Sequence, residues 1–354
     1  MQKVLFVIPK EMMENGIYSN YIKIMQKMNY EVQIITDFKQ EIKINFQRYL
    51  INISNNLFSL TNFIAYKKIK RIIKNNNFEI IICYGQIYGI LSRLVKDTKT
   101  QIIYIVDEFS SNKLICKIEK ILALKTKIII LTNKNDYIYA LKNLNIKIIR
   151  FVNGIGVNFN GKIIKKKNKT YTFFSSGEFN KSENQIQQLE SMIWIIKKYP
   201  QTKLIMSGNG KLKEYYENII EKYDLNQNVK IVDNNPEEKC DCFISTSKKN
   251  GFGSKIIKMM FLNIPILAFE TEKTKEILDK ENLFNNSEQL IKKMFEYIEN
   301  ENNYQDYQNL EKYKLENVLN ISEKIYKEIN SKKWKYFRLS LFDIIRTTFV
   351  DFQG

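Results

Sequence analysis

The sequence predicts an α/β protein of two doubly wound, Rossmann-like domains that face each other across a cleft. Short apolar runs alternate with helical stretches along most of the chain, which is the pattern of parallel sheets covered by helices on both faces. With 354 residues, the chain is long enough for two such domains with separate cores. The basic, glycine-led segment GKIIKKKNKT at 161–170 is expected to link the two halves.

The first domain is expected to span residues 1–160. Its apolar runs are separated by helical patterns, such as those at 18–29 and 64–76, and a parallel pair of strands needs such a long crossover. The expected strands are VLFVIP (4–9), EVQIIT (31–36), EIIICY (79–84), QIIYIV (101–106), KIIILT (127–132) and KIIRFV (147–152). This half of the chain therefore predicts one parallel sheet.

The second domain, expected over residues 161–320, repeats this pattern. Its helical stretches include 184–200, 211–225 and the segment that follows Gly253. The expected strands are YTFFSSG (171–177), TKLIMSG (202–208), VKIVD (229–233), CFIST (242–246) and PILAF (265–269). Ligands of such open parallel sheets bind at the carboxyl ends of the strands, so the cleft is expected there.

Residues 321–354 differ in kind and are expected to form a basic amphipathic helical tail. Apolar and aromatic side chains recur at helical spacing, with lysines and arginines around them: Trp334, Phe337, Leu341, Ile344, Ile345 and Phe349. Two interpretations stay open. The tail is either a last helix packed on the body of the protein or a helix that lies in a membrane interface.

Composition limits the chemistry. The chain has no His, which excludes Ser-His and Cys-His nucleophile pairs and His-ligated zinc, so acid and base roles would fall to Asp, Glu, Lys or Tyr. Four Cys in a chain of this size do not make a disulfide framework, and Cys240 and Cys242 have no second pair nearby. We expect no metal and no cofactor.

The location and the partners are predicted from charge and hydropathy. The apolar run VLFVIP is too short for a signal peptide, and no run of 18 apolar residues occurs, so a cytoplasmic protein is expected. The net charge of +18 is explained either by lysines spread over a solvated surface or by attraction to an anionic membrane. Nucleic acid is not an expected partner, because no helix-turn-helix, zinc-finger or RNP-type motif accompanies the charge.

The segment KKNGFGSKIIKMMFLNIPILAF, residues 248–269, carries the clearest functional signal. Gly251-Phe252-Gly253-Ser254 predicts a tight turn between the strand FIST and an amphipathic helix. Glycines let the backbone approach a ligand, and Ser254 is expected to cap the helix. Amide groups at a helix start favour an anion such as a diphosphate.

Other short motifs follow in a fixed order: Asn153-Gly154-Ile155, Ser176-Gly177, Gly208-Asn209-Gly210, Asp241 and Glu276-Ile277. Together with the 248–269 segment, this order and spacing resemble the retaining nucleotide-sugar glycosyltransferases of family 4. The resemblance covers about residues 1–297. It implies the GT-B fold, a nucleotide-sugar donor, a polysaccharide or lipid-linked glycan of the cell envelope as acceptor, and hexosyl transfer with retention of configuration.

The resemblance also implies site residues. The donor phosphates would be held by Gly251, Phe252, Gly253 and Ser254. Gly208 and Gly16 would assist, and Gly16 stands where the family has a pair of glycines. Asn250 stands where the family has a Glu that holds the donor sugar. Asp107, after the strand QIIYIV, faces the cleft where many members have His. Asp107 and Asn250 are therefore the candidate catalytic residues.

Three charged positions depart from the family pattern. Glu178 and Glu183 stand where the family has an Arg and a Lys that clamp the diphosphate, and Lys258 stands where it has a second Glu. We expect Glu178 and Glu183 to pair with Lys258 in the donor pocket. An alternative is that Lys181 supplies the missing cation.

Two functions follow from this pattern. The first is transfer of a sugar from a nucleotide-sugar donor to a cell-envelope polysaccharide or glycolipid, at the inner face of the membrane. The second is a role as a catalytically inactive GT-B-fold partner, or substrate-recognition subunit, of an active glycosyltransferase. Neither the donor sugar nor the acceptor has a portable code in the sequence.

Overall fold

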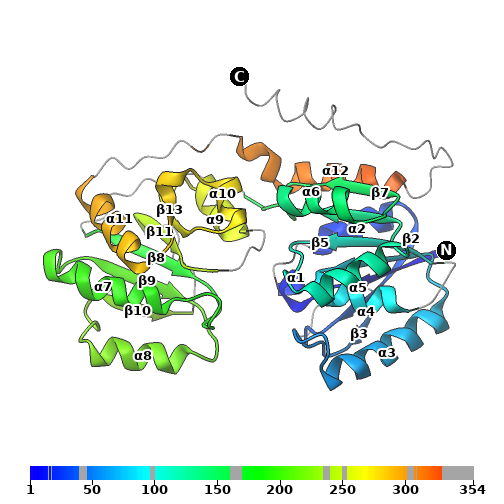
Figure 1. Ribbon diagram of the computed structural model, residues 1–354, viewed down its shortest axis with the longest axis horizontal. Helices are drawn as coiled ribbons and strands as arrows, with labels where there is room; N and C mark the ends of the chain where they lie inside the picture. Colours follow the sequence, from blue (N-terminus) through cyan, green and yellow to red (C-terminus); the bar gives the residue numbers. More distant parts are fainter. Residues whose placement is uncertain are drawn as a thin grey trace.

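The structure is a computed structural model, and it describes residues 1–14, 16, 18–39, 46–95, 100–159, 170–233, 240–248, 253–300, 307 and 309–328. Within these residues the chain forms two parallel β-sheets with helices on both faces of each, as the sequence predicts (Figure 1). Residues 160–169, which hold most of the expected linker, lie outside the described residues, and so does the tail from residue 329 onward.

The first sheet has the strand order β3-β2-β1-β4-β5-β6-β7, and every adjacent pair is parallel. The six expected strands are confirmed, and a short edge strand, β3, joins them. Its sequence, QRYL, is not an apolar run like those of the predicted strands, so the sequence did not indicate it. The bounds are β1 (Gln2–Val7), β2 (Tyr30–Thr36), β3 (Gln47–Leu50), β4 (Ile80–Tyr84), β5 (Gln101–Val106), β6 (Ile128–Leu131) and β7 (Ile148–Phe151).

Helices cover both faces of this sheet because the strands are apolar on both sides. One face packs against α2 (Tyr18–Lys27), which follows the short α1 (Lys10–Glu14). The other face packs against a layer of four helices. These are α3 (Leu60–Asn76), α4 (Gln86–Leu94), α5 (Lys113–Ala123) and α6 (Lys134–Asn143).

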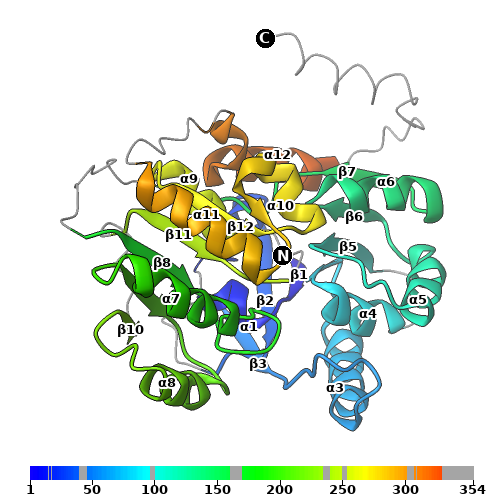
Figure 2. The ribbon, with the colours of Figure 1, turned by 60° about the vertical axis from the view of Figure 1, so that its left-hand side comes forward.

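The second sheet has the order β10-β9-β8-β11-β12-β13, again with every adjacent pair parallel. Its strands are β8 (Thr172–Ser176), β9 (Lys203–Ser207), β10 (Val229–Val232), β11 (Cys242–Ser245), β12 (Ile266–Phe269) and the two-residue β13 (Leu283–Phe284). Its helices are α7 (Ile186–Lys198), α8 (Lys213–Lys222), α9 (Ser254–Phe261), α10 (Glu272–Ile277) and α11 (Ser287–Glu299). Figure 2 shows α7 and α11 on the same side of this sheet.

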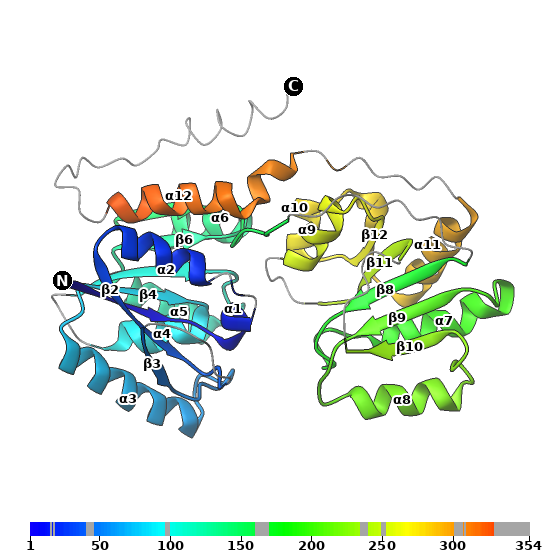
Figure 3. The same cartoon turned by 180° about the vertical axis from the view of Figure 1, so that it is seen from behind.

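The last described segment of the chain, residues 309–328, packs against the first domain. Helix α12 (Leu315–Lys327) lies over α2 and the first sheet (Figure 3). Arg150 of β7 binds the Glu328 carboxylate with two nitrogens, at 2.7 and 3.3 Å. Backbone bonds from Val157 to Tyr313 and from Leu315 to Val157 fix the start of α12. A domain boundary at residue 320 would therefore divide one continuous helix.

None of the helices in the described part of the chain is long and apolar enough to cross a membrane.

Candidate functional site

A cleft with a volume of about 370 Å³ lies between the two domains. Residues at the carboxyl ends of β4, β5, β8 and β11 form its walls, because parallel strands place those ends on one edge of each sheet. Its polar and charged lining residues are Tyr84, Asp107, Ser176, Glu183, Ser245, Ser247, Ser254, Lys255, Lys273 and Thr274. The sequence-predicted residues Asp107, Glu183, Gly253 and Ser254 are thus brought together in one place.

Asp107 forms the first-domain wall and lies directly after β5. The hydroxyl of Tyr84, at the end of β4, donates to Asp107 Oδ2, and Thr132 Oγ1 donates to Oδ1 at 3.3 Å. Burial raises the pKa of Asp107 to about 6, although these hydrogen bonds and the charge of Lys273 act in the opposite direction. Asp107 is therefore a carboxyl group that changes charge close to neutral pH.

The start of α9 forms the opposite wall. Gly253 is the N-cap of this helix and has the left-handed φ of 70°, a conformation that side chains with a Cβ disfavour. No side chain caps the helix, and Ser254 is its first residue. The expected cap by Ser254 is therefore wrong, because the left-handed turn at Gly253 starts the helix one residue earlier. Backbone amides and the Ser254 hydroxyl remain at the cleft.

Two lysines in the cleft were not predicted as site residues. Lys255, in the first turn of α9, donates from Nζ to the Ser176 carbonyl oxygen at 3.0 Å. Lys273, in α10, is 5% exposed and donates from Nζ to the Thr132 carbonyl oxygen of the other domain at 3.0 Å. Burial lowers the pKa of Lys273, whereas the negative charges of Glu276 and Asp107 oppose that shift. The site thus holds a cation within the electrostatic reach of Asp107.

Helix α10 also carries a carboxylate that joins the domains. Glu276 Oε1 accepts from the backbone amides of Lys134 and Asn135, at 3.0 and 3.4 Å, which are the first residues of α6. A carboxylate at a helix start is stabilised by the unpaired amides and by the helix dipole. Glu276 lies 3.6 Å from Lys273 Nζ. One short helix therefore places a cation in the cleft and holds the second domain against the first.

The turn between β8 and α7 separates the two glutamates. Glu183 lines the cleft, and a Cβ built on Gly177 would meet its Oε2 at 3.1 Å. Glu178 is exposed and accepts from Asn180 Nδ2 at 2.9 Å. Neither Glu178 nor the exposed Lys181 is among the described residues that line the cleft. Only one of the two substituted acids is therefore placed at the cleft.

The predicted glycines have two different surroundings. Gly208 packs against the neighbouring loop so closely that an added Cβ would lie 1.9 Å from the Gly177 carbonyl oxygen. Gly16 has a φ of 65°, and nothing lies within 4 Å of an added Cβ. Neither is among the described lining residues of the cleft. Their positions support loop packing at Gly208 and a turn between α1 and α2 at Gly16.

The remaining predicted residues are only partly placed. Asn250, Gly251 and Phe252 lie outside the described residues. Lys258 lies in the last turn of α9, half-buried, and is not among the described lining residues. The expected pairing of Lys258 with Glu178 and Glu183 stays a prediction.

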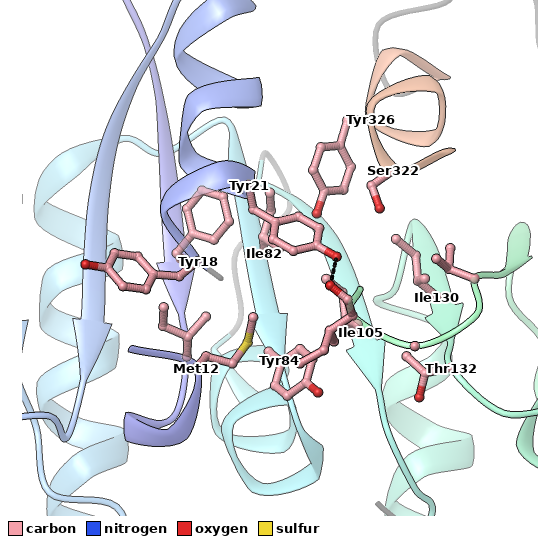
Figure 4. Close-up of a pocket in the computed structure, with 15 residues that line it drawn as sticks. Met12, Tyr18, Tyr21, Ile82, Tyr84, Ile105, Ile130, Thr132, Ser322 and Tyr326 are labelled. Atoms are coloured by element: carbon pink, nitrogen blue, oxygen red, sulfur yellow. Dashed lines mark hydrogen bonds between the residues drawn. The ribbon is translucent and has the colours of Figure 1, made fainter. Parts of the chain in front are cut away.

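Behind the cleft, a second and much smaller cavity lies inside the first domain (Figure 4). Met12, Tyr84 and Ile155 line both spaces, and Tyr326 of α12 closes the far side. Tyr21 donates its hydroxyl to the Ile155 carbonyl oxygen at 3.2 Å across this cavity. Its 20 Å³ leaves room for about one water molecule, so this smaller cavity is too small for a sugar.

The sequence was compared with known proteins. The model of the family described as "Glycosyl transferases group 1" matches residues 158–315, which contain α9 and α10. The putative glycosyltransferase EpsD of Bacillus subtilis is 23% identical over 316 residues, which are 80% of this chain and 83% of EpsD. These two matches support a glycosyltransferase of the group 1 type.

Solved structures confirm the GT-B fold of the chain. A sucrose-phosphate synthase from Thermosynechococcus elongatus superposes with a TM-score of 0.72 at 11% identity, over 93% of this chain and 99% of the other. HepE of Anabaena, solved in complex with UDP, superposes with a TM-score of 0.69 at 13% identity, over 92% of this chain and all of HepE. The narrower assignment to family 4 stays a prediction.

Proposed function

We propose that this glycosyltransferase moves a hexosyl group from a nucleotide-sugar donor to a polysaccharide or lipid-linked glycan of the cell envelope, with retention of configuration. The observation that carries the proposal is the pairing of two unlike walls in one cleft. The start of α9, Lys255 and Lys273 supply anion-binding groups from the second domain, and Asp107 with Tyr84 supplies hydrogen-bonding groups from the first.

The anion-binding wall suits the donor diphosphate. At about 4 Å and an effective dielectric constant of about 20, one charge contact is worth on the order of 4 kcal/mol. The family pattern places two cations in the β8–α7 turn, and this chain has Glu178 and Glu183 there. Lys273 reaches the same cleft from α10 instead, so we assign to it the main charge contact with the diphosphate. Lys255 supports this contact from α9.

Transfer requires stabilisation of the negative charge that develops on the leaving nucleoside diphosphate. Preorganised cations and helix-start amides supply this stabilisation in a partly desolvated cleft. Asp107, held by Tyr84 and Thr132, accepts a hydrogen bond from the acceptor hydroxyl and orients it toward the sugar. Such a mechanism needs no His, in agreement with the composition.

Donor turnover tests the proposal. The purified protein is incubated with UDP-, GDP-, ADP-, CDP- and dTDP-sugars, and release of the free nucleoside diphosphate is measured with and without membrane-derived acceptors. UDP-sugars come first, because UDP is bound in the HepE complex. We expect release from one donor class and loss of release in Asp107→Asn. If no donor is consumed and none binds, the proposal is wrong.

A second candidate is a catalytically inactive partner of another glycosyltransferase. Glu183 favours it, because this carboxylate lies in the cleft wall against Gly177, where it repels a phosphate. The two candidates differ in donor binding. An inactive partner binds no nucleotide-sugar even when its thermal unfolding shows an intact fold.

A further inference from the structure

Helix α3 has one face in the core and one face in solvent. Ala65, Ile69 and Ile73 are buried against the first sheet, and the buried Asn62 binds the preceding loop at Ser54 and Asn56. Ser59 caps the helix start by accepting from the Asn62 amide at 3.2 Å. The core contacts therefore fix which side chains point outward.

Exposed apolar side chains lie at the start of α3 and directly before its N-cap. Phe58, Leu60, Phe63 and Ile64 are 65%, 75%, 55% and 48% exposed. Four large apolar side chains within seven residues form a contiguous exposed cluster. Clusters of this kind on a protein surface usually mark an interaction site, because single exposed apolar residues are common but groups are not.

The rest of the outward face is basic. Lys67, Lys68, Arg71 and Lys74 continue it along the helix, and Lys67 Nζ lies 4.4 Å from the centre of the Phe63 ring. No Asp or Glu occurs between residues 42 and 78. We call these eight side chains, from Phe58 to Lys74, the α3 face. The α3 face combines apolar groups and cations without any anion.

We propose that the α3 face docks on an anionic membrane surface. A bilayer interface offers hydrocarbon for the apolar side chains and anionic headgroups for the cations, and helices with this composition lie in that interface. A second copy of the chain is a poor occupant, because two α3 faces repel each other. The proposal is independent of the sugar chemistry, since it concerns surface residues outside the cleft lining.

The position of α3 relates docking to the cleft. Strand β3 is parallel to β2 in the same sheet, so α3 begins at the carboxyl edge, where Asp107 follows β5. The helix then runs along the outer surface of the first domain (Figures 1 and 3). The apolar end of the α3 face is therefore at the edge of the sheet that faces the cleft. With the lipid-linked acceptor of the proposed function, on which this step rests, docking at this end would bring the cleft toward that acceptor.

Vesicle co-sedimentation of the full chain tests the proposal. The vesicles contain phosphatidylcholine alone or with phosphatidylglycerol. One variant carries Phe63→Ser and Ile64→Ser, and another carries Lys67→Glu, Lys68→Glu and Arg71→Glu. The matched control is Trp194→Ser with Lys197→Glu, because Lys197 Nζ lies 4.1 Å from the Trp194 ring, an exposed pair of the same kind on the second domain.

We expect binding only to the anionic vesicles, a loss of about tenfold or more in each α3 variant, and no loss in the control. Circular dichroism melting checks that each variant is folded. Equal binding by the α3 variants and the wild type would overturn the proposal, as would loss on removal of residues 329–354 alone. A change of molar mass by light scattering, with vesicle binding unchanged, would assign the face to a second copy and equally overturn it.

Discussion

Lys273 Nζ donates a hydrogen bond to the carbonyl oxygen of Thr132 at 3.0 Å, and this bond crosses from one domain to the other. The hydroxyl of the same Thr132 donates to Asp107. A buried cation of the second domain and a carboxyl of the first are thus held by one residue. This arrangement makes the cleft a shared site, because its charges depend on how the two domains meet.

Glu276→Gln is predicted to loosen the contact between the domains. The carboxylate accepts from two amides at the start of α6, and an amide side chain keeps the shape but removes the charge. The lost charge interaction is worth about 1 kcal/mol. This increases about fivefold the fraction of molecules in which the two domains are separated at this contact. Fluorescence energy transfer between labels on the two domains measures this.

Glu270→Gln is the control for that experiment, because Glu270 binds Asn285 within the second domain. Equal energy transfer in the wild type and in Glu276→Gln would show that the Glu276 contact does not hold the domains together.

Asp107→Asn is predicted to change the pH dependence of stability. Because the pKa of Asp107 in the folded protein is raised to about 6, above its ordinary value of 3.8, ionisation of Asp107 destabilises the fold. The stability from this group is fully present below about pH 4 and is lost as the pH rises through about 6. The melting temperature of Asp107→Asn relative to wild type should therefore rise between pH 5 and pH 7.

Melting curves at intervals of half a pH unit measure that difference. Asp241→Asn serves as a control for buffer effects, because Asp241 lies in the second domain and accepts from the Thr172 amide at 2.7 Å. A difference between Asp107→Asn and wild type that stays constant, or falls, across this range contradicts the raised pKa.

Gly208→Ala is predicted to destabilise the second domain by about 1–3 kcal/mol. The added methyl would lie 1.9 Å from the Gly177 carbonyl oxygen, so two loops would have to separate. Gly16→Ala should cost about 1–2 kcal/mol from its left-handed backbone alone, since no atom lies near the added methyl. Urea unfolding of both variants measures the free energies. Wild-type stability of Gly208→Ala would refute the close packing of the two loops.

Much of the fold follows from the sequence because most of its strands are apolar runs separated by helices. Two of the four edge strands, β3 and β13, could not be predicted: the sequence QRYL of β3 is not an apolar run, and the two residues of β13 are too few to show a pattern. The return of α12 to the first domain could not be predicted either. It depends on contacts such as Arg150 with Glu328, which are distant in sequence.

The candidate site was predictable where a local motif carries it. Gly253 and Ser254 stand in a strand-turn-helix pattern, and Asp107 follows a clear strand. Lys273 was not predicted, because a segment rich in Lys and Glu is typical of a solvent-exposed helix surface. The sequence did offer one indication: the motif Glu276-Ile277, which matches the family pattern, begins three residues after Lys273 on the same helix. Which lysine enters the cleft is decided by the docking of α10 on α6.

Calorimetric titration of Lys273→Met tests the central claim most directly. The wild type, Lys273→Met and Lys275→Met are titrated with UDP, GDP, ADP, CDP and inorganic pyrophosphate. Lys275 is the matched control, because it lies on the same helix but is exposed and pairs with Glu272 and Glu270. Pyrophosphate separates contacts to the phosphates from contacts to the base.

We predict that one nucleoside diphosphate binds the wild type, that Lys273→Met weakens its binding and that of pyrophosphate about tenfold or more, and that Lys275→Met changes neither by more than about twofold. Binding by Lys273→Met that is as tight as that of the wild type would contradict the assignment of the diphosphate to Lys273.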